Sequence, residues 1–279
     1  MRIDSHQHFW IYDPQRHDWI TNNMDVIRQN FLPDDILPIL KLNNIAGCVA
    51  VQTDQTEAET VFLLALADKY ESVIKAVVGW TDLTANDLYD KLEFFSQYET
   101  LKGFRHIAQT EAKDFLAQPN IIMGVRQLAA FDFTFDLLIE PPQLKAALQL
   151  VRACPDVKFV IDHLAKPYIR EQKLNTWSNY MKQLSENPNV YCKISGMVTE
   201  SDWLNWRKEQ FYPYLDVVFE TFGTDRLLFG SDWPVCLVAA EYEQVIGAVE
   251  NYMDLVGFSE TDKAKVFGQN AMNFYGIDR

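Results

Sequence analysis

The chain has 279 residues, of which 48% are hydrophobic, and it carries a formal net charge of -14 at pH 7. This length suffices for one large barrel or two small domains, and the negative charge argues against nucleic acid and anionic membranes as partners, because both would be repelled. The sequence has no apolar run of about 20 residues and no apolar signal-peptide stretch, and its four cysteines are scattered, so we expect a reduced cytoplasmic protein.

Eight short runs rich in β-branched or aromatic residues predict strands. Most are continuously apolar, as is typical of strands covered on both faces. In chain order they span 2–8, 47–52, 74–80, 103–107, 133–139, 157–161, 190–195 and 227–230. Amphipathic patterns predict helices over 54–70, 142–154, 212–222, 239–256 and 260–267. This alternation favours a single-domain α/β fold over residues 1–279, a (β/α)8 TIM barrel, and the absence of GxGxxG and Walker A patterns argues against a nucleotide-binding sheet.

The first predicted strand ends with a His-x-His pair. Residues two apart in an extended chain point to the same side, so His6 and His8 project together. Two neighbouring imidazoles can chelate one divalent metal or bind an anionic substrate. The long aromatic segment that follows, residues 9–35, is expected to cover the mouth of the barrel, with His17 at the surface.

Other polar candidates also stand where a predicted strand ends, which is where the active site of a (β/α)8 barrel gathers. Asp232 is a candidate general base or metal ligand, and a turn or helix-cap role is the structural alternative. His163 is a second candidate, unless it is a buried ring bonded to Asp162. Arg105 offers a planar fork of donors to an anion or a carbonyl, with pairing to a barrel carboxylate as its alternative.

Four further residues are expected to contact substrate around this cluster. Gln52 and His106 end the second and fourth strands, and Trp10 and Trp233 flank the His pair and the aspartate. Tryptophan rings suit the apolar face of a sugar, although two core tryptophans would explain the pattern nearly as well. Lys193, on the apolar seventh strand, is a cation that faces either the pocket or the barrel interior.

Five motifs occur in order on these strands: DSHQHFW, GFRHIAQ, DHLAKP, YCKISGM and FGSDWPV. Together they resemble the amidohydrolase superfamily, and within it the lactonase branch, which includes sugar lactonases and aromatic dicarboxylate lactonases. This resemblance implies that the positions of the family's metal ligands are occupied here by His6, His8, His163 and Asp232. No lysine ends the fourth strand and no histidine ends the fifth. The resemblance therefore implies at most one divalent metal, such as zinc, or a reaction without metal.

The resemblance implies hydrolysis of a small-molecule sugar-acid lactone, with L-fucono-1,5-lactone favoured. Asp232 would take a proton from the attacking water, while Arg105 and the histidines, or a metal held by them, would stabilise the oxyanion. His163 or His106 would protonate the leaving hydroxyl. The alternatives are a metal-dependent decarboxylase of a small aromatic acid and a sugar-acid-binding protein without catalysis. The sequence carries no signal for the oligomeric state.

Overall fold

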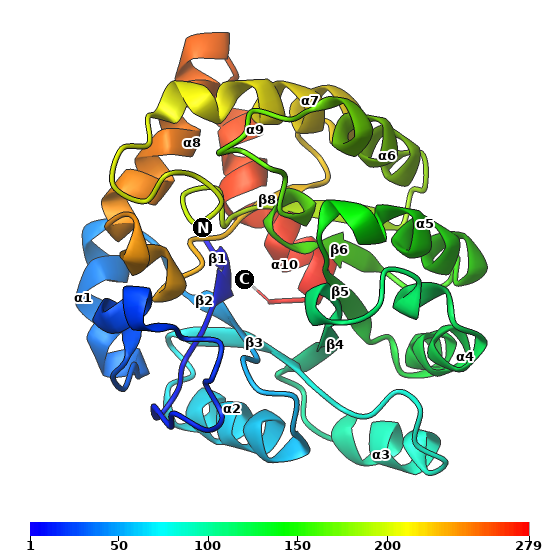
Figure 1. Ribbon diagram of the computed structural model, residues 1–279. Coiled ribbons are helices and arrows are strands. Elements are labelled where there is room, and N and C mark those ends of the chain that lie inside the picture. The colour runs from blue at the N-terminus through cyan, green and yellow to red at the C-terminus, as the bar shows by residue number, and fades with distance from the viewer. Residues whose placement is uncertain (279) are drawn as a thin grey trace.

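Eight parallel strands follow one another in chain order around a common axis in the computed structural model, which describes residues 1–278 (Figure 1). They are β1 (Asp4–Gln7), β2 (Cys48–Val51), β3 (Ile74–Gly79), β4 (Leu101–Ile107), β5 (Thr134–Leu138), β6 (Phe159–Ile161), β7 (Val190–Ile194) and β8 (Leu227–Phe229). A bridge between Gln7 of β1 and Trp233, in the turn after β8, links the two ends of the sheet. All eight predicted strands are present, and the predicted (β/α)8 fold is confirmed.

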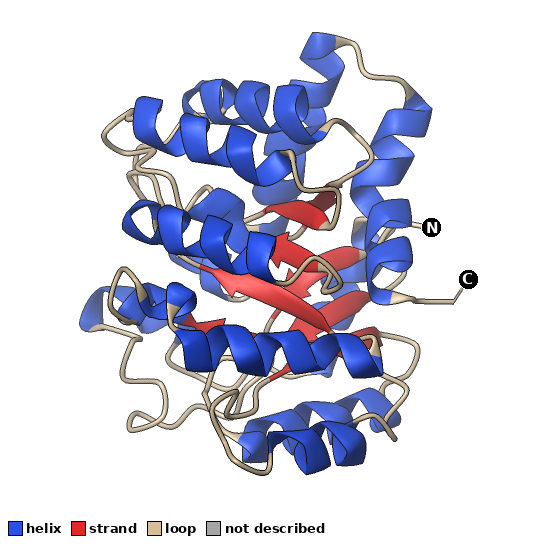
Figure 2. Ribbon diagram, turned by 90° about the vertical axis from the view of Figure 1, so that its right-hand side faces the viewer, coloured by secondary structure: helices blue, strands red, loops and turns tan. Residues whose placement is uncertain are grey.

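Helices surround the strands on the outside (Figure 2). They are α1 (Pro33–Leu42), α2 (Glu57–Lys69), α3 (Leu88–Phe95), α4 (Pro119–Gln127), α5 (Leu144–Ala153), α6 (Asn175–Ser185), α7 (Tyr212–Phe222), α8 (Tyr242–Val256), α9 (Glu260–Ala264) and α10 (Asn270–Tyr275). The helix predicted from residue 239 begins only at Tyr242, because the Glu241 N–H is capped by the side-chain oxygen of Gln244. Within residues 1–278, no helix has the length and apolar character needed to cross a membrane.

Side chains of alternate strand residues fill the barrel. An apolar group from several strands packs with α10 at the amino-terminal end: Ile3, Val49, Val51, Ala76, Val78, Val160, Leu228, Ala271, Met272, Phe274 and Tyr275. Five polar side chains also point inward and lie next to one another inside the barrel: His6, Arg105, Asp136, Asp162 and Lys193. The barrel therefore has an apolar base and a polar upper interior.

The segment over residues 9–35 covers the barrel mouth, as predicted, and its Trp19 lines the central cavity. An antiparallel bridge between Trp10 and Phe31 holds its two ends together. The prediction that His17 lies at the surface is wrong. Its ring is buried against the rings of Trp10 and Tyr12, at centroid distances of 5.7 and 5.9 Å, because the segment folds back on itself.

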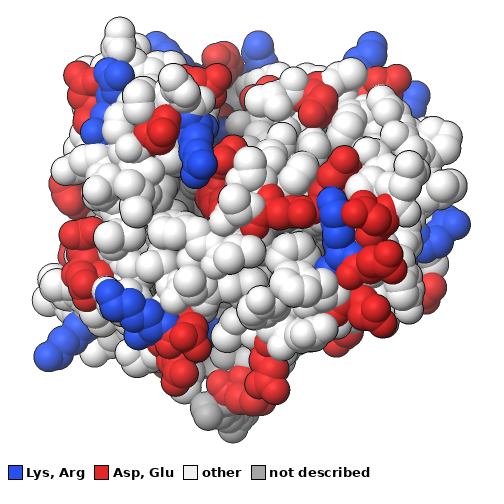
Figure 3. All heavy atoms as spheres, turned by 90° about the horizontal axis from the view of Figure 1, so that it is seen from below, with Lys and Arg blue, Asp and Glu red and all other residues white. Residues whose placement is uncertain are grey.

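The outer face over α2 and α3 carries acidic and basic side chains intermingled around an uncharged middle (Figure 3). An ion pair links these two helices, with the Lys91 ammonium 2.9 Å from Glu57 Oε1. On this face the negative charge of the chain is spread out and does not form one patch. The four cysteines are buried free thiols, as expected for small core residues.

Candidate active site

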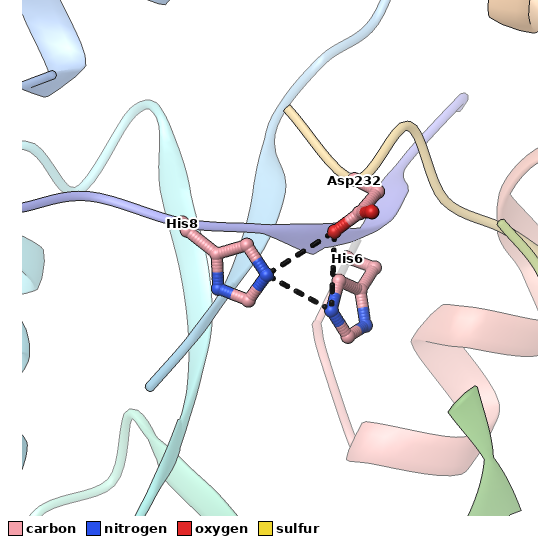
Figure 4. A group of neighbouring side chains, drawn as sticks. All are labelled: His6, His8 and Asp232. Atoms are coloured by element: carbon pink, nitrogen blue, oxygen red, sulfur yellow. Dashed lines mark hydrogen bonds and ion pairs between the residues drawn. The ribbon is translucent and has the colours of Figure 1, made fainter. Parts of the chain in front are cut away.

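His6 of β1, His8 directly after that strand and Asp232 after β8 meet at the carboxyl end of the barrel (Figure 4). The Nε2 atoms of His6 and His8 lie 3.2 Å apart. Asp232 Oδ1 lies 3.3 Å from His8 Nε2 and 3.9 Å from His6 Nε2, and all three side chains are buried. The structure thus brings together three of the residues that the sequence singled out for this site.

A tight turn after β8 delivers Asp232 to the histidines. Gly230 directly follows the strand, and a Cβ atom there would lie 2.6 Å from the His6 Cβ, so only glycine allows the two backbone segments to approach this closely. Asp232 itself has a left-handed φ of 61° and is held by its N–H, which donates to the His6 carbonyl at 2.9 Å. Burial would raise the pKa of Asp232, but the neighbouring His163, His8 and His6 rings outweigh burial and hold that pKa below its usual value. Asp232 is therefore ionised.

His163 completes the cluster from the turn after β6. Its Nε2 lies 3.9 Å from Asp232 Oδ1, and its Nδ1 lies 2.9 Å from Ser195 Oγ. Burial lowers the pKa of His163 to about 4 and that of His6 well below its ordinary value, because both rings are removed from water. At neutral pH these two rings are uncharged beside the Asp232 carboxylate, and His6 also lies 3.3 Å from Asp162.

Arg105 pairs with a barrel carboxylate, the alternative considered from the sequence, and it also lines the cavity. Its Nη1 donates to Asp162 Oδ2 at 3.1 Å and lies 3.3 Å from His6 Nε2. Its Nη2 donates to the backbone carbonyl of Gln52 and, at 3.1 Å, to the Gln52 side-chain oxygen. Gln52 therefore orients Arg105, and it lies outside the cavity lining.

A buried ion network lies next to the histidines inside the barrel. The Lys193 ammonium lies 2.6 Å from Asp136 Oδ2, 3.0 Å from Asp162 Oδ1 and 3.1 Å from His6 Nδ1. The Tyr275 hydroxyl donates to Asp136 from below at 2.8 Å. Lys193 thus faces the interior. Asp136 and Tyr275 were not predicted from the sequence, although the carboxylate of Asp136 at an inward position of an apolar strand was a signal for it.

A cavity of about 480 Å³ opens above this cluster. His8, Arg105, His163 and Asp232 line it together with side chains of the mouth segment and of the loops that follow the strands. The aromatic rings that line it are Trp19 and Trp203.

Like Gln52, the other three expected substrate contacts lie outside the cavity lining. Trp10 and Trp233 are core residues that both pack on Phe31, which holds the mouth segment down. His106 stacks on Phe115, and its Nε2 lies 3.2 Å from Glu111, outside the cavity lining.

The sequence pattern of the Amidohydrolase family matches residues 3–277. The chain belongs to the amidohydrolase family. The L-fucono-1,5-lactonase of Burkholderia multivorans is 36% identical to it, over 99% of this chain and 96% of the relative. A crystal structure of an amidohydrolase from Burkholderia multivorans with bound zinc is 35% identical, with a TM-score of 0.96 over 100% of both chains. A dihydroxybenzoic acid decarboxylase from Polaromonas sp. JS666 with bound manganese is 15% identical, with a TM-score of 0.70 over 100% of this chain and 97% of the decarboxylase. At that identity the decarboxylase shares the fold alone.

The donor set of this amidohydrolase fits one metal ion. His8 Nδ1 lies 2.7 Å from the Val51 carbonyl, which only accepts, so Nδ1 carries a proton and Nε2 is the ring nitrogen available to a metal. That nitrogen lies 3.3 Å from Asp232 Oδ1, a separation that a metal ion bound to both atoms would explain. Ligand atoms around tetrahedral zinc lie roughly 3.3 Å apart, which matches this distance and the 3.2 Å between the His6 and His8 nitrogens.

Proposed function

We propose that the protein is a lactonase that hydrolyses a sugar-acid lactone, with L-fucono-1,5-lactone as the first substrate to test. The observation that carries the proposal is the Asp232 carboxylate at the wall of a cavity of about 480 Å³, 3.3 Å from His8 Nε2 and 3.9 Å from His163 Nε2. A carboxylate of this kind can accept a proton from water next to a bound ester. The full-length similarity to an enzyme named L-fucono-1,5-lactonase supports the choice of substrate.

Residues that line the cavity each have a role in the proposed hydrolysis. Asp232 takes a proton from water as the water oxygen attacks the lactone carbonyl. Arg105, held by Gln52 and Asp162, stabilises the oxyanion that forms through its positive charge. The ring C–O bond then breaks, and the leaving oxygen takes back the proton that Asp232 accepted, either directly or relayed through His163. His106 has no part in this step, because it lies outside the cavity lining.

We propose that His6, His8 and Asp232, with His163 as a fourth candidate, hold one divalent metal, with zinc as the first ion to test. When bound there, the metal would polarise a carbonyl or lower the pKa of a bound water. The zinc in the related crystal structure supports the choice of ion. We further propose a cytoplasmic location, which fits four buried free thiols in a reducing compartment.

The test is lactone hydrolysis followed with a pH indicator, using chelated and zinc-loaded protein. L-Fucono-1,5-lactone and related aldonolactones should be opened, and Asp232→Asn should lower kcat by about 10²- to 10⁴-fold while the fold is retained. Full activity in that variant would refute the role of Asp232. No turnover of any lactone in either metal state would refute the proposed function. Release of CO2 from a dihydroxybenzoate would then favour the decarboxylase alternative, whereas ligand binding without turnover of either substrate class would favour the binding protein.

A further inference from the structure

The turn after β6 carries two cavity-lining side chains three residues apart. The φ angles of His163, Leu164, Ala165 and Lys166 are 51°, 54°, 57° and 47°, all in the left-handed region that residues other than glycine rarely adopt. In a turn with three residues per repeat, positions i and i+3 share a face. His163 and Lys166 accordingly both line the cavity, while the two residues between them are completely buried. The turn thus directs Lys166 into the same cavity as His163.

Lys166 meets two polar side chains from other loops at the cavity wall. Its Nζ lies 3.0 Å from the side-chain oxygen of Gln109, which follows β4, and 3.2 Å from Glu200 Oε1, which follows β7. All three line the cavity that Asp232 lines. The Lys166 and Glu200 side chains keep 21% and 23% of their surface exposed, so they remain within reach of a ligand.

These three side chains have hydrogen-bonding capacity to spare. An ammonium has three donors, a carboxylate has about four acceptor positions and a glutamine amide has two N–H donors. Contacts within the group use two donors of Lys166 and one oxygen of Glu200. Among residues 1–278, the second Glu200 oxygen and the Gln109 amide nitrogen have no protein partner within hydrogen-bond distance. Donors and acceptors therefore stand side by side, facing the cavity.

We infer that Lys166, Glu200 and Gln109 form a subsite that binds adjacent hydroxyl groups of the lactone ring and selects polyhydroxylated lactones over unsubstituted ones. Each hydroxyl both donates and accepts a hydrogen bond, so neighbouring hydroxyls suit a cation and a carboxylate placed side by side. Trp203, which also lines the cavity, offers a flat apolar surface for the carbon face of such a ring. The inference rests on the proposed lactonase function for the identity of the ligand.

The first test compares kcat/KM for L-fucono-1,5-lactone and for δ-valerolactone, which has the same ester and no hydroxyl groups. Lys166→Met and Glu200→Gln should each lower kcat/KM for the hydroxylated lactone by about 10- to 100-fold, the effect of one hydrogen bond to a charged group. The value for δ-valerolactone should change by less than about threefold. Lys91→Met removes an ion pair of similar length outside the barrel and should leave both values unchanged.

An equal fall for both lactones would assign Lys166 to the chemistry or to folding and overturn the inference, and unchanged selectivity would overturn it as well. Thermal melting of each variant checks that it is folded.

Titration calorimetry supplies a second test that needs no turnover. The wild type should bind L-fuconate at least about 10-fold more tightly than 5-hydroxypentanoate, and Lys166→Met should abolish this preference. If no lactone is hydrolysed but this preference is found and lost in the variant, the subsite stands and the lactonase function fails. If lactones are hydrolysed and neither selectivity nor preference depends on Lys166, the subsite fails and the function stands.

Discussion

Lys193 is the central cation of the buried ion network, and Lys193→Met should strongly destabilise the folded protein. Its ammonium lies 2.6 Å from Asp136 and 3.0 Å from Asp162, and all three side chains are completely buried. Methionine is of similar length and carries no charge, so the variant removes the charge and largely retains the packing. Asp162 then keeps Arg105 at 3.1 Å, whereas Asp136 keeps only the Tyr275 hydroxyl among the described contacts.

The size of the effect follows from the carboxylates left behind. Removing one partner of a buried ion pair costs about 3–5 kcal/mol, because an uncompensated charge stays in the interior. We keep this range for Lys193, although it serves two carboxylates, because Arg105 still compensates Asp162. With an unfolding entropy of about 2.1 cal/mol/K for each of 279 residues, 1 kcal/mol lowers Tm by about 1.7 °C. The expected fall in Tm is therefore about 5–9 °C.

Differential scanning calorimetry at pH 7.5 tests this magnitude against a surface control. Lys158→Met removes an ammonium 3.1 Å from Asp132, in a pair whose side chains are 45% and 85% exposed. Such a pair is worth less than about 1 kcal/mol, so the control should melt within about 2 °C of the wild type. If Lys193→Met melts within the same 2 °C or above the wild type, the argument from uncompensated buried charge is refuted.

Two further predictions concern pH and metal binding. Burial raises the pKa of Glu59 from 4.5 to about 7, so between these values the folded state holds a proton that the unfolded state has lost. The free energy of unfolding should then fall by about 2–3 kcal/mol between pH 5 and pH 8 relative to Glu59→Gln, and urea titrations that show no such difference would contradict the shift. His8→Ala removes a candidate ligand nitrogen and should weaken zinc binding by about 10²-fold or more in calorimetry, whereas His106→Ala should leave it unchanged. Equal zinc affinities in the two variants would place the metal elsewhere.

The strands were predictable because the barrel covers both of their faces. Helices pack on the outside and inward side chains on the inside, so a strand such as β2 (Cys48–Val51) is an unbroken apolar run in the sequence. The position of the candidate site was predictable for a related reason, since all eight parallel strands end at the same rim. This places His6 and Asp232 together without any knowledge of the loops.

The contacts that depend on register and loop packing were not predictable. Whether Trp10 enters the cavity depends on its bridge with Phe31, which is 21 positions away and has no local signature. The pairing of Lys193 with Asp136 requires two strands that are not neighbours in the sheet to present inward residues at the same height. A period of two identifies both as inward residues, but it does not say that they meet.

The left-handed turn that carries His163 shows where folding energy is used to position the cluster. A residue other than glycine loses roughly 1–2 kcal/mol in this conformation, and none of the four residues in the turn is the Asn or Asp that tolerates it best. Ala165→Gly should relieve that strain, which offsets the buried methyl group it removes. Ala147→Gly, equally buried in α5, loses the same methyl group without any relief and should be destabilised by about 2 kcal/mol. If urea unfolding shows that Ala165→Gly is at least 1 kcal/mol less damaging than Ala147→Gly, the turn is strained in the folded protein, and equal losses would show that it is relaxed.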